Sequence, residues 1–400
     1  MTVMQSTSRG PWISSARGLS APGAIVWVLW LILTGLGLYG LYLRVQYGHI
    51  LAGYGSYVPW GLWIGLYFLG VGISGGAFLL GGLGFILGLP GFSTRSELRI
   101  AISLSVAALI PSFLGVALDL GRTERLLNIL AFPSFTSMMA FNAWMYNIFL
   151  VVAGLAWLIS FKDHSTWLKP LLVAGCFFSI LFPSQSGVFF EAVRTNAFWH
   201  SPILSVLFLA SAVALGSVGL LFTRYMTNLS GKTGASQGQD ADQAVGRLRV
   251  VAIFAIGTYL VFEFAEFSVA FWNPGAHSKS MIFLLFGDYW PVFWLLHIGL
   301  GALIPMALFL SRARALWPIA SALAAIGFAA ARMSVLVPGQ IAGQIPGLQE
   351  AFQDPRLVYS YHPTLMEYLV GCLMLAVGIA TFVVIQRLSD TIGQWTKQTA

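Results

Sequence analysis

The stretch that decides the fold spans residues 58–88 and reads VPWGLWIGLYFLGVGISGGAFLLGGLGFILG. Its length is sufficient for one helix to cross the hydrocarbon core of a bilayer, which is about 30 Å thick. It holds ten glycines, including the small-xxx-small pairs Gly61/Gly65 and Gly72/Gly76. Such pairs let helices approach closely in lipid, where packing drives association. This helix is therefore predicted to lie at the centre of a bundle.

The rest of the chain is similarly apolar. Of its 400 residues, 58 % are hydrophobic and 9 % are charged, and the mean hydropathy is +0.81. We predict an all-α integral membrane protein and exclude a soluble one. The first apolar segment is too long for a signal-peptide core and lacks a small-x-small cleavage site, so we expect it to remain as a span. The ten expected transmembrane segments are 25–46, 58–88, 99–118, 138–160, 168–190, 199–223, 249–271, 289–310, 316–337 and 364–386.

The distribution of basic residues predicts the topology. Ten spans place both ends of the chain on one side of the membrane, and 14 of the 21 Lys and Arg residues fall on that side. Arg332 lies within a span, and the opposite side has only Arg44, Arg122, Arg125, Arg194, Lys279 and Arg356. The positive-inside rule then predicts cytoplasmic termini in a bacterial inner membrane. Because the basic residues are scattered among short loops, we expect no nucleic-acid binding.

A weak internal sequence repeat predicts the domain organisation. The small-residue pattern of 208–216 resembles that of 68–76. We expect two four-helix bundles, formed by spans 2–5 and spans 6–9 and flanked by spans 1 and 10. The segments are 1–56 for the N-terminus and span 1, 57–190 for the first bundle, 191–337 for the second, and 338–400 for an outer loop, span 10 and the C-terminus. Residues 224–249, rich in Gly, Ser, Gln and Asp, are predicted to be a flexible cytoplasmic linker.

An unusually charged stretch, LDLGRTER at 118–125, follows directly on an apolar segment and faces outward in this topology. A carboxylate at a helix end, followed by a glycine and two arginines, can hold a polar ligand at the membrane edge. Alternatively, Arg122 and Arg125 are interfacial anchors and Asp119 is their ion-pair partner.

Ionisable side chains within spans cost about 2.5–3.5 kcal/mol each on insertion scales, so they are usually paired or functional. The predicted topology places all of them in the outer half of the membrane. Glu263 and Glu266 share a helix face, where two like charges favour proton exchange. Alternatively, Arg332 neutralises one of them in a buried ion pair. We expect a proton-transfer or coupling set made of His200, Glu263, Glu266, His297, Arg332 and Glu367.

The sequence offers little for metal or haem binding. Cys176 and Cys372 have no partner at metal-binding spacing, so we expect no metal site and no iron–sulfur cluster in this chain. A two-haem cytochrome b needs four histidines on spans, and only His297 lies firmly inside one. The histidines still allow a single haem bound between His297 and His200. We nevertheless expect a haem-free chain.

Several motifs resemble, in order, those of the NrfD/PsrC family, the membrane subunits of polysulfide reductase-like complexes. WIGLYFLGVGISGGAFL at 63–79 resembles its aromatic, glycine-rich opening. LDLGRTER at 118–125 is similar to its LDLGRPER motif, with Thr123 at the usual proline. WHSP at 199–202 and the segment 133–144 resemble the entries to its second half and its fourth core helix. Ten spans and the ending YHPT…Glu367 resemble the long branch found in certain hydrogenases, sulfite-reduction-associated complexes and alternative complex III.

The resemblance implies a quinone-binding subunit with menaquinone or ubiquinone as substrate. It also implies an iron–sulfur partner on the outer, periplasmic face, which serves a further catalytic or cytochrome subunit. By the family's pattern the quinone lies in the first bundle, with Tyr146 or Asn142 donating to a carbonyl and Asp119 accepting a proton. The residues expected at the quinone are Tyr57, Trp60, Trp63, Tyr67, Asp119, Arg122, Asn142 and Tyr146. Those expected to face the partner are Glu124, Arg125, Tyr361 and His362.

Two other functions remain open on the sequence. Repeated bundles and intramembrane charges also occur in secondary transporters, although the charges here crowd one half of the membrane rather than its midplane. The chain could also be a membrane anchor without its own quinone site, since tryptophans at span ends are commonly interfacial.

Overall fold

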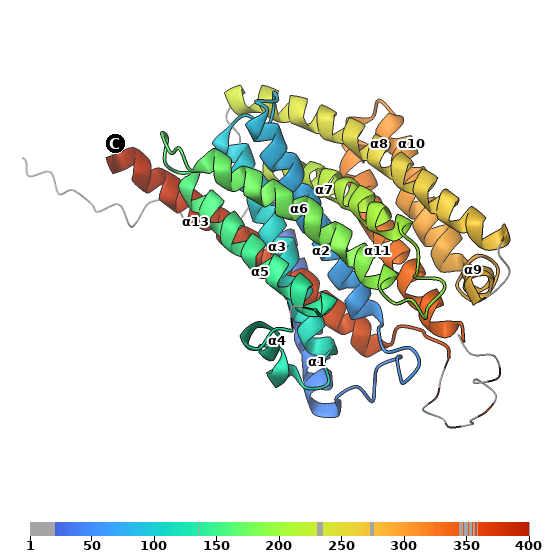
Figure 1. Cartoon of the computed structure of the whole chain (residues 1–400). Helices are drawn as coiled ribbons and strands as arrows, with labels where there is room; N and C mark the ends of the chain where they lie inside the picture. Colours follow the sequence, from blue (N-terminus) through green and yellow to red (C-terminus); the bar gives the residue numbers. More distant parts are fainter. Residues whose placement is uncertain are drawn as a thin grey trace, which may run out of the picture.

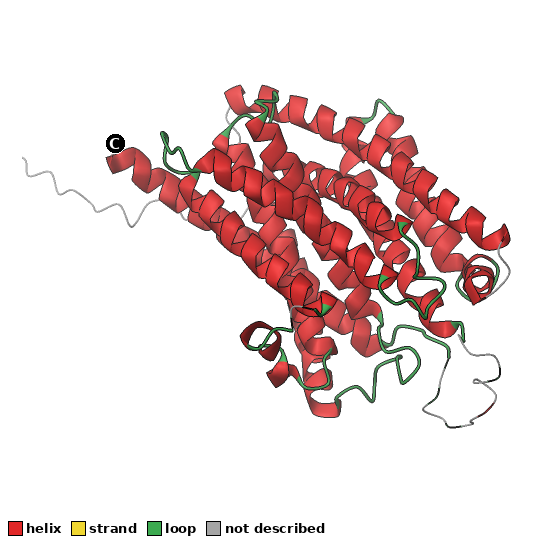
Figure 2. Cartoon of the chain, in the orientation of Figure 1, coloured by secondary structure: helices red, strands yellow, loops and turns green. Residues whose placement is uncertain are grey.

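The computed structural model describes residues 21–134, 136–229, 235–272, 276–343, 347, 351, 354, 357 and 359–399. Within these ranges the chain is built of helices and connecting loops, and it contains no strand (Figure 2). Ten of the helical segments are long and apolar enough to cross a membrane. The prediction of an all-α fold with ten membrane spans is therefore confirmed.

The spanning segments are arranged as shown in Figure 1. They are α1 (Ala21–Tyr47), α2 (Leu62–Ile86), α3 (Arg95–Asp119), α5 (Met138–Ile159), α6 (Leu168–Glu191), α7 (Ile203–Leu229), α8 (Ala235–Trp272), the π-helix η2 (Pro291–Leu303) continued by α10 (Ile304–Leu310), α11 (Trp317–Ile341) and α13 (Leu365–Thr399). Four short helices lie in the connections: η1 (Thr123–Arg125), α4 (Asn128–Ala131), α9 (Ala276–Leu285) and η3 (Arg314–Leu316).

Helix α2 lies at the centre, as its glycines predict. It packs against α3, α6 and α7, and 67 % of its most apolar window is buried. The crossing with α7 is a contact between backbones: a Cβ on Gly76 would lie 1.8 Å from the carbonyl oxygen of Ala212, and one on Gly216 would lie 2.1 Å from the carbonyl carbon of Gly76. Only glycine permits this approach.

The helices around this crossing form two rings of neighbours. In one ring α2, α3, α5 and α6 each contact the next, and in the other α7, α8, α10 and α11 do so. The rings meet through α2, α6, α7 and α11. Helix α1 packs against α13, and α13 packs against α3, so both outer helices lie on the side of the first ring.

The expected flexible linker at 224–249 is wrong over most of its length. Helix α7 continues to Leu229 and α8 begins at Ala235, with residues 230–234 outside the described ranges. Ala244, Val245 and Leu248 are buried in the core. These three small or apolar residues share one helix face. The polar residues around them dominate the composition of the segment, so a prediction from composition alone does not reveal that face.

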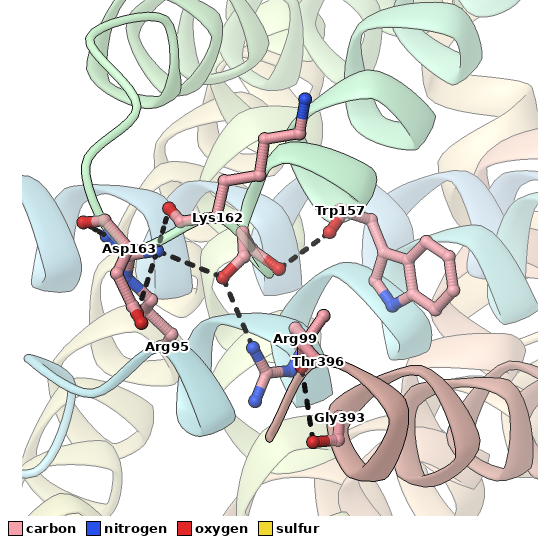
Figure 3. Close-up of polar contacts among 8 residues, drawn as sticks. Arg95, Arg99, Trp157, Lys162, Asp163, Gly393 and Thr396 are labelled. Carbon is pink, nitrogen blue, oxygen red and sulfur yellow. Dashed lines mark hydrogen bonds and ion pairs between the residues drawn. The ribbon is translucent and has the colours of Figure 1, made fainter. Parts of the chain in front are cut away.

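The helix ends collect at two ends of the molecule. We call them the Asp119 end, where α3 ends and α2 begins, and the Arg95 end, where α3 begins and α2 ends. They lie at the bottom and the top of Figure 1, respectively. At the Arg95 end, Arg95 and Arg99 of α3 donate to the carbonyl of Ser160, both at 3.3 Å, and Arg95 pairs with Asp163 at 3.6 Å (Figure 3). Two arginines thus satisfy the carbonyl groups that end α5.

Candidate functional site

A buried carboxylate organises the Asp119 end. Glu367, in the first turn of α13, is fully buried. Its side chain accepts hydrogen bonds from the Tyr361 hydroxyl at 2.9 Å, the Thr364 backbone N–H at 2.8 Å and the Gly53 backbone N–H at 3.2 Å. Buried carboxylates are stable only with such partners, so Glu367 fixes the loop before α2 against the start of α13.

The start of α2 is tied to the same carboxylate. The backbone N–H of Leu62 donates to the Tyr361 hydroxyl at 2.6 Å, and the indole N–H of Trp63 donates to the Glu367 carbonyl at 3.0 Å. Burial raises the pKa of Tyr361, and the Glu367 carboxylate raises it further, so the phenol stays protonated. Two expectations are corrected here. Tyr361 is 1 % exposed and cannot face a partner. Glu367 is hydrogen-bonded to the loop before α2 and to the start of α13, and no hydrogen bond or ion pair joins it to Glu263, Glu266 or His297 among the described residues.

Asp119 lies next to this cluster, beside the hydroxyl of Tyr54. Its Oδ1 and that hydroxyl are both buried and lie close enough to interact with each other, and neither has a further hydrogen-bond partner among the described residues. Burial raises the pKa of Tyr54, and the charges of Asp119 and Glu367 add to the effect, so both carboxylates lie within electrostatic reach of this hydroxyl. Buried polar atoms are normally hydrogen-bonded, which makes this pair a candidate contact for a polar ligand.

The charged residues after Asp119 do not pair with it. Arg122, Glu124 and Arg125 are exposed, and no ion pair joins Asp119 to either arginine within the described ranges. The interfacial arginine is instead Arg44 of α1, which donates to the carbonyls of Leu118 at 2.7 Å and Leu120 at 2.9 Å. Arg44 is also close enough to act electrostatically on the Asp119 carboxylate, although no ion pair joins the two side chains among the described residues.

A second polar group lies deeper, inside the first ring. The Tyr67 hydroxyl of α2 donates to the Tyr146 hydroxyl of α5 at 2.8 Å, and the Tyr146 hydroxyl lies 3.2 Å from the hydroxyl of Ser186 on α6. Asn142 is one helical turn from Tyr146 and is also buried, as the four-residue spacing predicts. The side-chain oxygens of Asn142 and Gln185 have no hydrogen-bond partner among the described residues.

These two groups lie at neighbouring depths. Phe113 of α3 packs against Tyr146, with ring centroids 5.8 Å apart, so the two residues share a level. Asp119 is six residues and Asn142 four residues nearer to the Asp119 end. At about 1.5 Å per residue their depths differ by only ~3 Å. Asp119 and Asn142, on the adjacent helices α3 and α5, therefore present unpaired oxygens at nearly one level.

The other aromatic residues expected at the quinone lie on the far side of α2. Tyr57 stacks on Tyr359, with centroids 4.0 Å apart, and Trp60 stacks on Trp199 at 5.9 Å. The backbone of Trp60 also exchanges two 3.0 Å hydrogen bonds with the side chain of Gln340. Tyr57 and Trp60 thus hold the end of α11 and its following loop, whereas Trp63 and Tyr67 belong to the clusters described above.

The second ring has its own buried charges, in separate pairs. His297, on the π-helix η2, lies 2.9 Å from Glu263 Oε2, and Tyr259 donates to Glu263 Oε1 at 3.2 Å. Glu266 accepts from the Ser201 hydroxyl and lies 3.9 Å from Nε2 of His277. Although the two glutamates share a face of α8, their carboxylates contact different neighbours.

Arg332 does not neutralise either glutamate. Its guanidinium donates to the Ser211 hydroxyl and lies 4.0 Å from the ring centroid of Phe208, both on α7. It has no ion pair among the described residues, and its Nε and one terminal nitrogen have no hydrogen-bond partner there. Arg332 points toward the α2–α7 crossing, since a Cβ on Gly72 would lie 3.5 Å from it. His200 is exposed, with Nδ1 2.8 Å from the Glu191 carbonyl oxygen.

Sequence reasoning missed Tyr54, Arg44, Ser186, Gln185 and His277. The polar run Ser184-Gln185-Ser186 inside an otherwise apolar span is a signal that could have found two of them. Tyr54 lies in a loop and carries no such signal.

The fold and these residues define a ten-span helical membrane protein with buried carboxylates near one end. No group of three or more potential metal ligands occurs in the part of the chain that the structure describes. The family model described as polysulphide reductase, NrfD, matches residues 51–343. The chain therefore belongs to the NrfD family, as its motifs predict.

Its relatives include proteins named as subunits of different oxidoreductases. A selenate reductase subunit of Mesobacillus selenatarsenatis is 26 % identical over 392 residues, covering 86 % of this chain and 90 % of the relative. The Hdr-like menaquinol oxidoreductase integral membrane subunit of Archaeoglobus fulgidus is 26 % identical, covering 88 % and 89 %. Protein NrfD of Escherichia coli is 24 % identical, covering 70 % and 95 %.

Proposed function

We propose that this chain is the quinone-reactive membrane subunit of a respiratory oxidoreductase complex. It exchanges electrons between a membrane quinone and an iron–sulfur partner subunit that serves a further catalytic or cytochrome subunit. The carrying observation is the buried pair formed by the Tyr54 hydroxyl and Asp119 Oδ1, which has no further hydrogen-bond partner among the described residues and lies beside Glu367, inside the family's matched region. The relative named as a menaquinol oxidoreductase subunit supports menaquinone or ubiquinone as the substrate.

The side chains at the Asp119 end suit the oxidation of a quinol, a reaction that transfers two electrons and two protons. Oxidation of a quinol releases two electrons, which go to the partner, and two protons, which need an acceptor at the headgroup. Asp119 lies beside the buried Tyr54 hydroxyl and forms no ion pair among the described residues, so its carboxylate is the proposed acceptor. The amide of Asn142 supplies hydrogen bonds at a depth similar to that of Asp119, and the amide of Gln185 does so deeper, at the level of the Tyr67–Tyr146–Ser186 group. Quinone reduction uses the same groups in the reverse direction.

The orientation of the complex follows from charge. The Arg95 end collects most of the basic residues, so we place it in the cytoplasm of a bacterial cell, with the Asp119 end outward. The iron–sulfur partner then docks at the Asp119 end. Glu124, Arg125 and His362 are exposed there and suit such a contact, whereas the buried Tyr361 supports the site from within.

The quinone assignment is tested by the quinone that stays with the purified complex. Asn142→Leu removes the amide and should lower the bound quinone severalfold in extracts of the intact complex. Asn147→Leu is the control, because the Asn147 amide donates to the Ala143 carbonyl of its own helix at 2.7 Å. Equal quinone content in both variants and the unaltered complex would exclude Asn142 from the site.

We further propose that the second ring carries a proton route through His200, Glu266, Glu263, His297 and Arg332. The support is burial: Glu263, Glu266 and His297 are buried, and His200 is exposed at the Asp119 end. Glu263→Gln keeps the size of the side chain and loses its charge. It should lower the number of protons moved per electron while quinol oxidation continues, and an unchanged ratio would contradict this route.

A further inference from the structure

A groove of about 510 Å³ lies at the Arg95 end, far from the candidate quinone site. One wall is formed by the end of α2 and the turn that follows it, with Leu80, Leu89 and Phe92. The other is formed by the first half of α8, with Gly246, Arg247 and Val250. Figure 1 shows the start of α8 beside the end of α2 at the top of the molecule. This volume lies within the usual range of ligand pockets, roughly 300–1,000 Å³.

The groove has a preformed inner wall. The ring of Phe92 is buried beneath the guanidinium of Arg224, which lies 4.9 Å from the ring centroid. Arg224 is in turn held by Glu97, with 2.7 Å between NH1 and Oε2. Because this ion pair is buried and fixed, Phe92 keeps its place and the groove does not depend on a mobile side chain.

The polarity of the groove's lining changes along the membrane normal. Its deep part is apolar, since Leu80 lies six residues before the end of α2 at Ile86, about 9 Å deeper by helical rise. Its rim carries Arg247, which is exposed and has no ion pair among the described residues. An apolar slot beneath a single exposed cation matches a molecule with a long hydrocarbon chain and an anionic head.

The flank of α8 shows which solvent the groove faces. Val250, Phe254 and Val261 are 41 %, 71 % and 68 % exposed and form an apolar surface that continues from the groove along the spanning part of α8. In a membrane protein such a surface contacts lipid. The groove therefore opens sideways into the bilayer at its basic edge.

We propose that this groove binds one anionic phospholipid, with an acyl chain between α2 and α8 and the phosphate beside Arg247. The site is separate from the proposed quinone site and does not depend on it. By bridging the end of α2 to the start of α8, the lipid joins the two helical rings at the Arg95 end.

The chain offers a matched pair of variants to test this. Gly246 lines the groove, and a Cβ there would meet no atom within 4 Å, so Gly246→Leu fills the groove without a clash. Gly257, on the same helix but outside the groove, is equally free, and Gly257→Leu is the control. Arg247→Gln removes the charge alone.

The measurement is native mass spectrometry of the purified full chain, delipidated and then supplied with phosphatidylglycerol or with phosphatidylcholine of the same acyl chains. We expect phosphatidylglycerol to be retained in preference, about fivefold less with Arg247→Gln. We expect retention to be lost with Gly246→Leu and unchanged with Gly257→Leu. Equal retention by Gly246→Leu and the unaltered chain, or by Arg247→Gln, would overturn the proposal.

Two further outcomes are decisive. If the molecule displaced by Gly246→Leu is a quinone rather than a phospholipid, the proposed occupant is wrong. If Gly246→Leu does not fold, Arg247→Gln decides alone, because this exposed side chain makes no contact that the fold needs. A loss of phosphatidylglycerol preference then supports the site, and a preserved preference rejects it.

Discussion

At the scale of single residues, Glu367 determines the shape of the candidate quinone site. Its carboxylate joins the loop after α1, the start of α2 and the start of α13 through Gly53, Tyr361 and Thr364. The neighbouring Asp119 accepts no hydrogen bond from a backbone N–H through its Oδ1 among the described residues, and this oxygen lies beside the buried hydroxyl of Tyr54. The carboxylate of Glu367 thus holds the fold together, whereas that of Asp119 remains available for proton transfer, although both are acidic residues at helix ends in the sequence.

Close approach at Gly61 is required for this arrangement. A Cβ at Gly61 would lie 2.5 Å from both Glu367 Oε1 and the Tyr361 hydroxyl. Gly61→Ala should therefore destabilise the protein by about 1–3 kcal/mol through overpacking. Gly121→Ala, where a Cβ meets no atom within 4 Å, should have little effect. Thermal unfolding of the two variants in the same detergent measures the difference, and equal melting temperatures would contradict the packing described.

Part of the site was predictable residue by residue. Asp119, Asn142 and Tyr146 were predicted from their motifs and spacing. Asn142 and Tyr146 lie one turn apart on α5, and Asp119 lies at a depth similar to that of Asn142 on the adjacent α3. Their role at a quinone stays a prediction. Tyr54 could not be predicted, because a loop tyrosine reaches Asp119 only through tertiary folding. The role of Glu367 was also hidden, because its partners lie as far away in sequence as Gly53.

At the scale of elements, the glycines of α2 set the arrangement of the helices. The α2–α7 crossing brings Gly76 and Gly216 into backbone contact. The ten spans were predictable because each is an apolar run of sufficient length. The ends of α7 and α8 were not, because their burial depends on a narrow apolar stripe within a polar segment. Nothing in Pro291–Leu303 distinguishes a π-helix from an α-helix, so that element was not expected.

The crossing makes a strong prediction. In Gly76→Ala, the new Cβ would lie 1.8 Å from the Ala212 carbonyl oxygen, and a backbone atom cannot move aside as a side chain does. We expect a loss above about 3 kcal/mol and little folded protein. Gly154→Ala, on α5 with open space around it, is the control. Size-exclusion chromatography after membrane extraction reports the folded fraction, and a normal yield of Gly76→Ala would show that the crossing is looser than described.

At the scale of the whole molecule, the two proposed roles lie in different rings: quinone binding in the first ring and proton transfer in the second. The first ring and its flanking helices hold the unpaired polar atoms at the Asp119 end, and the second ring holds the paired carboxylates Glu263 and Glu266. Arg332, on α11, lies between the two rings near the α2–α7 crossing, where its guanidinium contacts α7 and lies close to α2. In the proposed function, electrons enter or leave at the Asp119 end, and protons pass through the second ring.

The most direct test of the proposed function is quinol oxidation by the intact complex carrying Asp119→Asn. Because a positioned proton acceptor contributes about 10²–10⁴-fold to such a step, turnover should fall by at least about a hundredfold, with the set of subunits and the iron content unchanged. Asp242→Asn, at an exposed ion pair on the Arg95 end, should keep full turnover. Full quinol oxidation by Asp119→Asn in an intact complex would contradict the assignment of this residue and of the site built around it.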